Sequence, residues 1–356
     1  MFVIPNFPTL LLRRIKRDFL RLRPQKTLDL KFAGRRLPNS VTLLGRYSPP
    51  TILESQGVFE DRPVSHAFQS RGFYSVVDAT IDSNMGEIYL DSDEFLIQST
   101  PWHPYVPNPE RRPPFIKPRR LSQPGGYIRL PTWTYYHQVV EYLAPYLFLR
   151  RKFPRAITLV PEEGSSLARA ILEDLEIEYE TFRNAVTVNK LYFVENGNDS
   201  GYPHPRDIEI LKSDIIPLAL NKHGGSSGHG DESVVYVSRL SSERSPVNEL
   251  ALIEGLRNLK SVRVIESETL SFLEQVSRFR TARHIIGVHG AGLTNQIWMD
   301  PGGNVLELVD LNYSNPVFSS LAKLCSHSHS PIFMTQTVKG PEIDLGQTFE
   351  LIAALD

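Results

Sequence analysis

The sequence has very little cysteine: Cys325 is the only one in 356 residues. A single cysteine cannot close a disulfide within the chain, which excludes the disulfide-rich secreted class and fits a reducing compartment. Net charge is also nearly absent, with 39 Lys and Arg against 40 Asp and Glu. This balance gives no support to nucleic-acid binding, which needs a basic surface.

Long apolar runs are missing as well. The best candidate, residues 139–149, contains Glu141 and Pro145 and is too short to span a bilayer. At the N-terminus the apolar residues come before the basic ones, which is the opposite of the order in a secretory signal peptide. We therefore expect a cytoplasmic protein.

What the sequence does contain is enough chain for two domains of ordinary size, each with its own core. Residues 223–232 are rich in glycine and serine and have no apolar side chain, as is typical of a linker. We predict an N-terminal domain over residues 1–222 and a C-terminal domain over residues 233–335. A last segment, residues 336–356, is expected to pack back on the N-terminal domain.

Residues 11–23 have the pattern of a basic amphipathic helix. Leu12, Ile15, Phe19 and Leu22 recur at helical spacing among arginines and lysines. Such a helix can lie on an anionic membrane surface, and we expect peripheral contact with the inner face of the cell membrane. The alternative is a solvated helix docked on its own domain.

The pair Asp91 and Asp93 follows a short β-rich run. An Asp-x-Asp pair can hold a divalent metal ion on a nucleoside diphosphate. Nothing nearby in the sequence completes a ligand set, so we expect no metal site.

A helix is predicted over residues 133–148. His137 and Glu141 stand four residues apart in it, so they share one face. A carboxylate beside an imidazole suits the removal of a proton from a substrate, because each group biases the charge state of the other. An ordinary pair on a helix surface is the alternative.

The C-terminal half alternates regularly between strands and helices. Strands are predicted over residues 234–237, 262–265, 285–288 and 305–309, and Ser245 is expected to cap a helix that has Pro246 at its first position. Together with a strand over residues 156–160 and a helix over residues 167–175, this pattern predicts Rossmann-like α/β domains with parallel sheets. Ligands of such sheets bind at the carboxyl ends of the strands.

The run His289-Gly-Ala-Gly-Leu-Thr-Asn295 reads as a tight turn between a strand and a helix. Glycine has no Cβ, so a ligand can approach the amides of Gly290 and Gly292 closely, and the start of a helix attracts phosphate. Arg239 and Arg244, which follow another strand, could neutralise a diphosphate at the same sheet edge. A glycine turn without a ligand and surface arginines are the alternatives.

These motifs resemble, in order and spacing, those of glycosyltransferase family 61. The resemblance covers residues 133–308, and its bacterial members include capsular polysaccharide enzymes. Gln138 and Gln296 depart from the family pattern, which bears on the specificity for sugar or acceptor. The matching motifs are Tyr136-His137 with Glu141, Tyr236-Val-Ser-Arg239, Arg244, Asn248-Glu249, His289 to Asn295 and Asn304-Val-Leu-Glu-Leu308.

The resemblance implies a GT-B-like fold, in which two Rossmann-like α/β domains face each other across a cleft. It implies transfer of a sugar with inversion from a nucleotide sugar, such as a UDP-sugar, to a glycan acceptor, with no obligatory metal or other cofactor. Glu141, or His137 assisted by it, would take the acceptor proton. The implied donor-binding residues are Arg239, Arg244, Asn248, Glu249, His289, Gly290, Ala291, Gly292, Leu293, Asn295 and Glu307.

Two other functions fit parts of the sequence. In an NAD-dependent oxidoreductase, Gly290-x-Gly292 would bind the pyrophosphate and Asp310 the ribose, although Asn295 stands where a third glycine is usual. A saccharide-binding protein that kept the GT-B fold and lost turnover is the second alternative. Reduced nicotinamide binding would distinguish the first, and polymer binding without release of nucleoside diphosphate the second.

Overall fold

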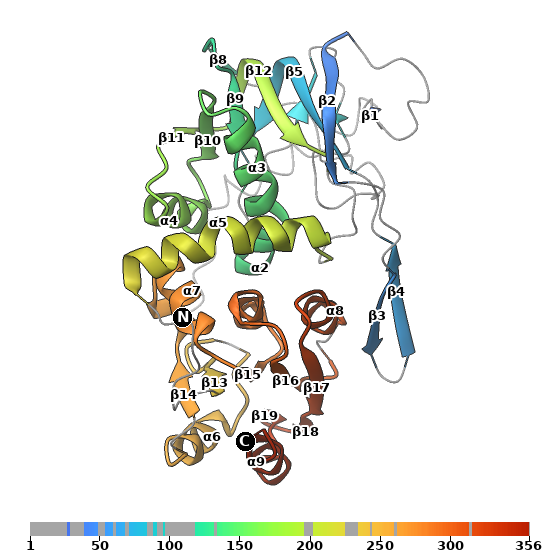
Figure 1. Ribbon diagram of the computed structural model, residues 1–356, viewed down its shortest axis with the longest axis vertical. Helices are drawn as coiled ribbons and strands as arrows, with labels where there is room; N and C mark the ends of the chain where they lie inside the picture. Colours follow the sequence, from blue (N-terminus) through green and yellow to red (C-terminus); the bar gives the residue numbers. More distant parts are fainter. Residues whose placement is uncertain are drawn as a thin grey trace, which may run out of the picture.

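The computed structural model describes a mixed α/β protein (Figure 1). The basic stretch 11–23, the Asp91–Asp93 pair and most of the expected linker lie outside the described residues. No helix in the described part of the chain is both long enough and apolar enough to cross a membrane. The described residues are 27–28, 39–48, 54–59, 62–67, 71–83, 88–90, 95–96, 118–131, 134–195, 202–224, 234–242, 244–259, 262–312 and 315–355.

The C-terminal half is built on a five-stranded parallel sheet. Its order is β14-β13-β15-β16-β17, with all neighbouring strands parallel. The central strands carry continuous apolar or buried runs, as expected for a sheet that is covered on both faces. The bounds are β13 Val234–Val237, β14 Val262–Ile265, β15 His284–Val288, β16 Asn304–Val309 and β17 Ser328–Phe333.

Helices cover both faces of this sheet, so the C-terminal half is a doubly wound, Rossmann-like unit (Figure 1). Helix α7 (Phe272–Arg280), the 3-10 helix η4 (Ala291–Trp298) and α8 (Val317–Leu324) lie on the face toward the N-terminal half. Helices α6 (Glu249–Leu256) and α9 (Leu345–Ala353) lie on the opposite face. The short 3-10 turn η3 (Ser267–Thr269) follows β14, and a hairpin of β18 (Thr335–Thr337) and β19 (Gly340–Glu342) precedes α9.

The N-terminal half contains a mixed ten-stranded sheet. Its parallel part joins β9 to β10, β10 to β11 and β12 to β9, whereas the long strands β5 and β12 are antiparallel. Short parallel pairs join β1 to β7 and β8 to β12. Strands β2, β6 and β7 join the sheet through antiparallel pairs, and β3 and β4 form a separate antiparallel hairpin. The bounds are β1 Thr27–Leu28, β2 Val41–Ser48, β3 Glu54–Phe59, β4 Arg62–Ala67, β5 Arg71–Asp82, β6 Ile88–Tyr89, β7 Phe95–Leu96, β8 Arg119–Leu121, β9 Tyr127–Arg129, β10 Ile157–Pro161, β11 Tyr179–Phe182 and β12 Ala185–Val194.

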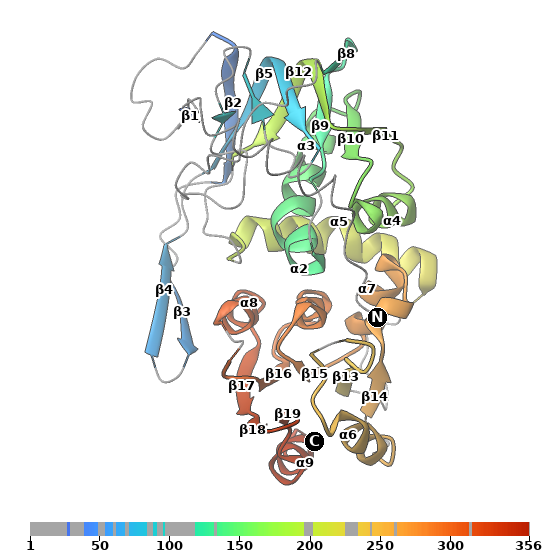
Figure 2. The same cartoon turned by 180° about the vertical axis from the view of Figure 1, so that it is seen from behind.

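Helices of the N-terminal half fill the space between the two sheets (Figure 2). The helix predicted over residues 133–148 is present, but it passes through a π-helical stretch. It runs as α2 (Tyr135–His137), η2 (Gln138–Leu143, π-helix) and α3 (Ala144–Lys152). The helix predicted over residues 167–175 is α4 (Ser166–Asp174).

Helix α5 (Pro205–His223) has no clear signal in the sequence, and it crosses the molecule between its halves (Figure 1). A capping box explains its start: the Nδ1 atom of His204 accepts from the amide of Arg206 at 3.0 Å, and Asp207 accepts from the amide of His204 at 3.0 Å. Pro205 stands at its first position, where a missing N–H is harmless. Apolar residues of α5 and α7 belong to one buried cluster that continues through both halves.

Two expectations for the C-terminal half are corrected by the structure. Helix α6 begins at Glu249 after Asn248, because Ser245 is used differently: its hydroxyl donates to the Glu249 carboxylate at 2.6 Å. The described residues after residue 335 pack within the C-terminal half, where the sequence predicts packing on the N-terminal domain. Ile343 and Ile352 are buried in the same cluster as Leu252 and Leu256 of α6.

Candidate functional site

A cavity of about 540 Å³ lies where the C-terminal sheet meets the N-terminal half. It opens over the carboxyl ends of β13, β14 and β15, which is where parallel α/β sheets bind ligands. Its floor comes from the segments that follow these strands, and α2, α4 and α7 supply its walls. The lining residues are Tyr135, Ser166, Leu167, Ala170, Ile171, Val237, Ser238, Arg239, Arg244, Ser267, Glu268, Leu270, Ser271, Phe272, Gln275, Ala291 and Gly292.

Two guanidinium groups line this cavity. Arg239 is half-buried, and its Nη1 donates to the carbonyl oxygen of His289 at 2.7 Å while its Nη2 donates to Ser242 at 3.1 Å. Arg244, five residues on, is exposed. A cation held in place by two hydrogen bonds needs little further ordering when it binds an anion, and arginine presents a fork that matches phosphate oxygens.

The glycine turn brings η4 close to β13. A Cβ on Gly290 would lie 2.4 Å from Nη1 of Arg239, and a Cβ on Gly292 would lie 2.6 Å from Cγ1 of Val237. Gly290 has φ of 161°, which is extended backbone. The reason for glycine here is therefore the close approach of neighbouring groups, and not a left-handed conformation.

Glu249, the first residue of α6, is hydrogen-bonded to the segment that follows β13. It is fully buried, and its carboxylate accepts hydrogen bonds from the Tyr236 hydroxyl at 2.9 Å, the Arg239 amide at 2.6 Å and the Ser245 hydroxyl at 2.6 Å. Burial, reinforced by this carboxylate, raises the pKa of Tyr236. Glu249 therefore positions Arg239 from behind and does not line the cavity.

A second buried carboxylate, Glu307 on β16, holds the glycine turn from the other side. Its two oxygens bind Nδ1 of His289 and Nε2 of His329, the latter at 2.6 Å. Burial alone would raise the pKa of Glu307, but the hydrogen bonds from the two imidazoles outweigh it, and the pKa is lowered. An ionised Glu307 accepts from both rings, so the His289 ring carries its proton on Nδ1.

Asn295 links η4 to both halves of the protein. It is fully buried. Its Oδ1 accepts from the Tyr135 hydroxyl at 2.9 Å and from the Trp298 indole at 3.0 Å, and its Nδ2 donates to Gln275 at 3.1 Å. Every side-chain contact of Asn295 that the structure shows is therefore internal, and it shapes the cavity wall by fixing Tyr135.

His137 and Glu141 form the contact that their spacing predicts. Nδ1 of His137 and Oε1 of Glu141 are 2.9 Å apart, and the Glu141 side chain is only 7% exposed. His137 is the last residue of α2, and Glu141 lies within the π-helical stretch η2. A π-helical stretch of this kind frequently marks a functional site.

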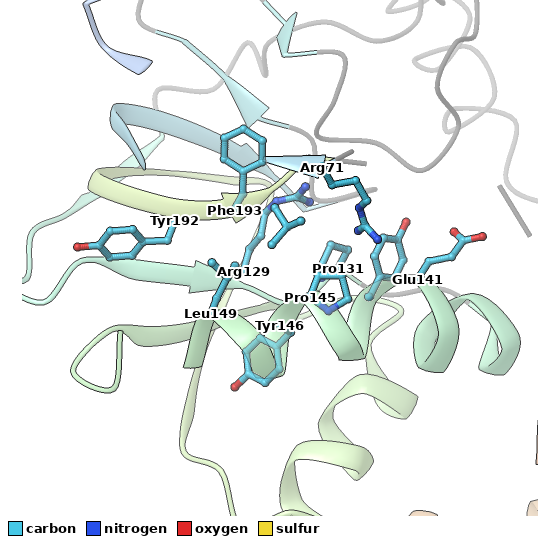
Figure 3. Close-up of a pocket in the computed structure, with 11 residues that line it drawn as sticks. Arg71, Arg129, Pro131, Glu141, Pro145, Tyr146, Leu149, Tyr192 and Phe193 are labelled. Atoms are coloured by element: carbon cyan, nitrogen blue, oxygen red, sulfur yellow. The ribbon is translucent and has the colours of Figure 1, made fainter. Parts of the chain in front are cut away.

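Glu141 also borders a second cavity, of about 40 Å³, which is large enough for ordered water but not for a sugar. Figure 3 shows the Glu141 carboxylate at the margin of this cavity, turned away from Pro131 and Pro145. The guanidinium of Arg71, which also lines it, is bound by Asp207 at 2.9 Å. The small cavity is therefore bordered both by Glu141 and by Arg71, which is paired with the buried Asp207.

Some of the residues predicted from the sequence line a cavity, and others support the lining from within the protein. Arg239, Arg244, Ala291 and Gly292 meet in the large cavity, whereas Glu141 borders the small one. Gly290, His289, Glu307, Glu249 and Asn295 stand behind the cavity and hold its lining. Leu293 is fully buried in the core, and the Asn248 amide is paired with the backbone of Ile343 at 2.8 and 2.9 Å.

Several residues that line the large cavity have no motif in the sequence that marks them. Ser267 and Glu268 begin the short turn after β14, separated from the strand by Glu266, so the rule that ligands bind at strand ends could have identified them. Tyr135 and the residues of α4 come from the other half of the chain, and only the packing of the two halves brings them to the cavity. Within the described residues no group of three or more His, Cys, Asp or Glu side chains is arranged to hold a metal ion.

Comparison with known proteins adds one finding. The family model described as Glycosyltransferase 61 matches residues 135–306. This range begins at α2, includes the glycine turn and ends within β16. A search of curated proteins returns no match to the chain.

Proposed function

Residues 135–306 form a glycosyltransferase family 61 domain, and the chain is a glycosyltransferase of that family. From the geometry of its large cavity we propose the following reaction. The chain moves a sugar, with inversion, from a nucleoside diphosphate to a hydroxyl of a cell-surface or capsular polysaccharide. The donor is a nucleotide sugar such as a UDP-sugar. The observation that carries the proposal is the cavity at the strand ends, with Arg239 and Arg244 in its lining.

The size and charge of this cavity support a nucleoside-diphosphate donor. Its volume of about 540 Å³ is within the range of ordinary ligand pockets. The guanidinium groups, with the first amides of η4, supply the positive charge that a leaving diphosphate needs as the glycosidic bond breaks. Preorganised charge of this kind lowers the barrier because it need not reorient during the reaction.

Inversion follows from a single displacement. The acceptor oxygen attacks the anomeric carbon from the face opposite the diphosphate, the carbon–oxygen bond to the diphosphate breaks, and a base takes the acceptor proton. Glu141, or His137 assisted by it, is the proposed base, because their contact at 2.9 Å couples an imidazole to a carboxylate. Both belong to the N-terminal half, which we propose as the acceptor side of a GT-B arrangement with domains over residues 1–222 and 233–335.

The geometry gives no support to NAD binding. In that alternative Asp310 would bind a ribose, but its carboxylate accepts from the Asn312 amide at 2.9 Å and from Gln336 at 2.8 Å. Asp310 is also absent from the lining of the large cavity. Membership of a glycosyltransferase family likewise argues against a binding protein without turnover.

The proposed setting is the cytoplasm, at the inner face of the cell membrane, where nucleotide sugars are consumed in polysaccharide assembly. The basic stretch 11–23 would supply the peripheral contact. Sedimentation with anionic vesicles, and its loss when the arginines of residues 13–23 are replaced by glutamine, would test this. Equal sedimentation of both proteins would argue against it.

The donor is tested by thermal shift with a panel of UDP-, GDP-, CDP- and dTDP-sugars, followed by measurement of released nucleotide. We expect one nucleotide class to raise the melting temperature of the wild-type protein. Arg239→Ala should abolish the rise, and Arg257→Ala, an exposed arginine at the end of α6, should preserve it. Full donor affinity in Arg239→Ala would overturn the diphosphate assignment.

A further inference from the structure

Helix α2 ends at His137 of the proposed base pair, and two consecutive tyrosines attach this helix to the C-terminal half. The Tyr135 hydroxyl donates to Asn295 of η4 at 2.9 Å. The ring of Tyr136 meets the ring of Phe318 in α8 edge-on, with the ring centres 5.4 Å apart. Figure 2 shows α2 close to α8. The position of His137, the next residue along the chain, therefore depends on contacts with the half of the protein that does not contain it.

The Phe318 ring contacts aromatic rings from both halves of the protein. One is Tyr136, whose ring in turn meets the His137 imidazole edge-on, with the ring centres 5.5 Å apart. The other is the imidazole of His289, at 5.1 Å, which Glu307 binds. Phe318 is 3% exposed, Tyr136 6% and His289 4%. One buried ring thus joins the proposed base to the start of the glycine turn.

Tyr136 lies beside both members of the proposed base pair. Its ring packs on His137, and the charge of Glu141 adds to burial in raising the pKa of the Tyr136 hydroxyl. His137 and Glu141 are themselves in contact at 2.9 Å. A change in the position of Tyr136 would therefore move the pair.

An aromatic side chain at position 318 does more than fill space. Edge-on ring pairs have a preferred geometry, so they orient the rings as well as burying them. Leucine would fill much of the same volume without orienting Tyr136 or His289. Phe318 also lies outside residues 135–306, the range that the family model matches.

We propose that Phe318 is a positioning residue for the sugar transfer. Through Tyr136 it keeps the His137–Glu141 pair at a fixed distance from the turn after β15, where the diphosphate is held. The inference rests on the proposed function, because it assumes that this pair takes the acceptor proton. In an inverting displacement the acceptor oxygen and the diphosphate lie on opposite sides of the anomeric carbon, and a misplacement of about 1 Å can cost about 100-fold in rate.

The first test needs no substrate and uses the imidazole signals in the nuclear magnetic resonance spectrum. The chain has 10 histidines, and His137→Gln identifies the His137 signal by its loss. We expect Phe318→Leu to shift this signal, because the ring that orients Tyr136 is gone. Phe182→Leu, which changes a phenylalanine that is 7% exposed in a separate buried cluster, should leave it in place. An unshifted His137 signal in folded Phe318→Leu would overturn the inference.

The second test measures turnover with the nucleotide sugar that the thermal-shift panel identifies. Phe318→Ala should lower kcat about 10- to 100-fold and leave the KM for the donor within about twofold, since only the base is misplaced. Phe318→Leu should lose less. Phe182→Ala should reduce the melting temperature as Phe318→Ala does, but the folded protein should keep its kcat. A loss of core packing alone would not separate kcat from KM in this way.

The double variant with Glu141→Gln shows whether Phe318 acts through the base. If it does, adding Phe318→Ala to Glu141→Gln should lower kcat by less than about twofold, because a base that is already absent cannot be misplaced. Fully multiplicative losses would overturn the inference. Phe318→Leu supplies the same comparison if Phe318→Ala does not fold.

The outcomes separate this inference from the proposed function. If Glu141→Gln loses turnover while both Phe318 variants keep it, the role of Phe318 is wrong and the proposed base stands. If Glu141→Gln keeps full turnover, the proposed base is wrong and the role of Phe318 is wrong with it. Absence of turnover with every nucleotide sugar of the panel would overturn both.

Discussion

Arg239 donates a hydrogen bond of 2.7 Å to the carbonyl oxygen of His289. This contact ties the segment after β13 to the turn after β15, so the positions of the guanidinium and of the glycine turn depend on each other. The His289 ring is in turn bound by Glu307 and, through Glu307, linked to His329. A cation in the cavity is therefore supported by a chain of contacts that crosses four strands of the sheet.

Replacing Arg239 should weaken phosphate binding more than it weakens the fold. We expect Arg239→Ala to reduce affinity for inorganic pyrophosphate by about 10- to 100-fold, since a hydrogen bond between charged groups contributes about 1.5–3 kcal/mol. Arg239→Lys should recover only part of this loss, because an ammonium lacks the planar fork. Calorimetry measures both, with Arg257→Ala as the matched control, and unchanged affinity in Arg239→Ala would contradict the assignment.

Adding one methyl group at Gly290 should have the same effect without removing any charge. The new Cβ would lie 2.4 Å from Nη1 of Arg239, so the guanidinium must move. We expect Gly290→Ala to weaken pyrophosphate binding about as much as Arg239→Ala. The double variant should be no weaker than Arg239→Ala alone.

Gly346→Ala is the control for that substitution, because the added Cβ meets only Asp344, at 3.4 Å. It should leave pyrophosphate binding unchanged. Additive losses in the Gly290→Ala and Arg239→Ala double variant would show that the methyl group acts by some route other than Arg239.

Glu307 should make folding stability depend on pH in the acid range. Its pKa in the folded protein is lowered below the ordinary value of 4.5, so its stabilising contribution is complete above that value. The contribution is lost as the pH falls through the lower, folded-state pKa. At neutral pH we expect Glu307→Gln to lose about 3 kcal/mol of unfolding free energy, since it breaks a buried charged network.

Denaturant unfolding of wild type and Glu307→Gln between pH 3 and pH 7 measures this effect. The difference between the two proteins should shrink as the pH falls below about 4.5. Glu350→Gln, at an exposed position of α9, should follow the wild-type curve. A constant difference across the whole range would show that the Glu307 charge is not the cause.

The contact between Tyr135 and Asn295 should connect the two halves energetically. Tyr135→Phe removes only the hydroxyl that donates to Oδ1 of Asn295 at 2.9 Å. We expect a loss of about 1 kcal/mol in unfolding free energy. Weaker nucleotide binding should accompany it, because Tyr135 lines the cavity.

A double-mutant cycle with Asn295→Ala tests whether the two residues act together. The coupling between them should be about 0.5 kcal/mol or more, as for residues in direct contact. Tyr179→Phe, which loses an exposed contact with Glu173, is a matched control for the removal of a hydroxyl. Independent effects of the two substitutions would show that the hydrogen bond contributes nothing.

Glu141→Gln should separate binding from turnover. If Glu141 takes the acceptor proton or assists His137 in doing so, the variant should keep donor affinity and lose about two to four decades of turnover. The comparison requires the donor that the thermal-shift panel identifies, with Glu163→Gln as an exposed control. Unimpaired turnover in Glu141→Gln would remove Glu141 from the mechanism.

The regular C-terminal half could be predicted well from sequence. Its strands alternate with helices, and short apolar runs such as 234–237 have few other stable arrangements in a parallel sheet. The contact between His137 and Glu141 also followed from spacing alone. The start of α6 did not, because a proline after a serine marks a helix start only where the serine is not engaged elsewhere, and Ser245 bonds to Glu249.

Contacts between residues that are far apart in the chain could not be predicted from the sequence. Helix α5 has Pro217 in its interior and weak amphipathic patterning, and its stability comes from packing on both halves of the protein. The supporting roles of Glu249 and Glu307 depend on which hydroxyls, amides and imidazoles reach them, which is a property of tertiary packing. The cavity wall formed by α4 follows only from how the two sheets are arranged.

Helix α5 has a consequence for how ligand could be exchanged. Leu211 and Ile215 of α5 are buried in one cluster with Phe279 of α7 and Trp298 of η4. A hinge motion that separates the two halves would expose these side chains to water. Exposing three of them would cost roughly 5–9 kcal/mol, which is a large part of the unfolding free energy of an ordinary domain. Ligand should therefore enter and leave the cavity by small displacements of the segment after β13, while the two halves keep their relative position.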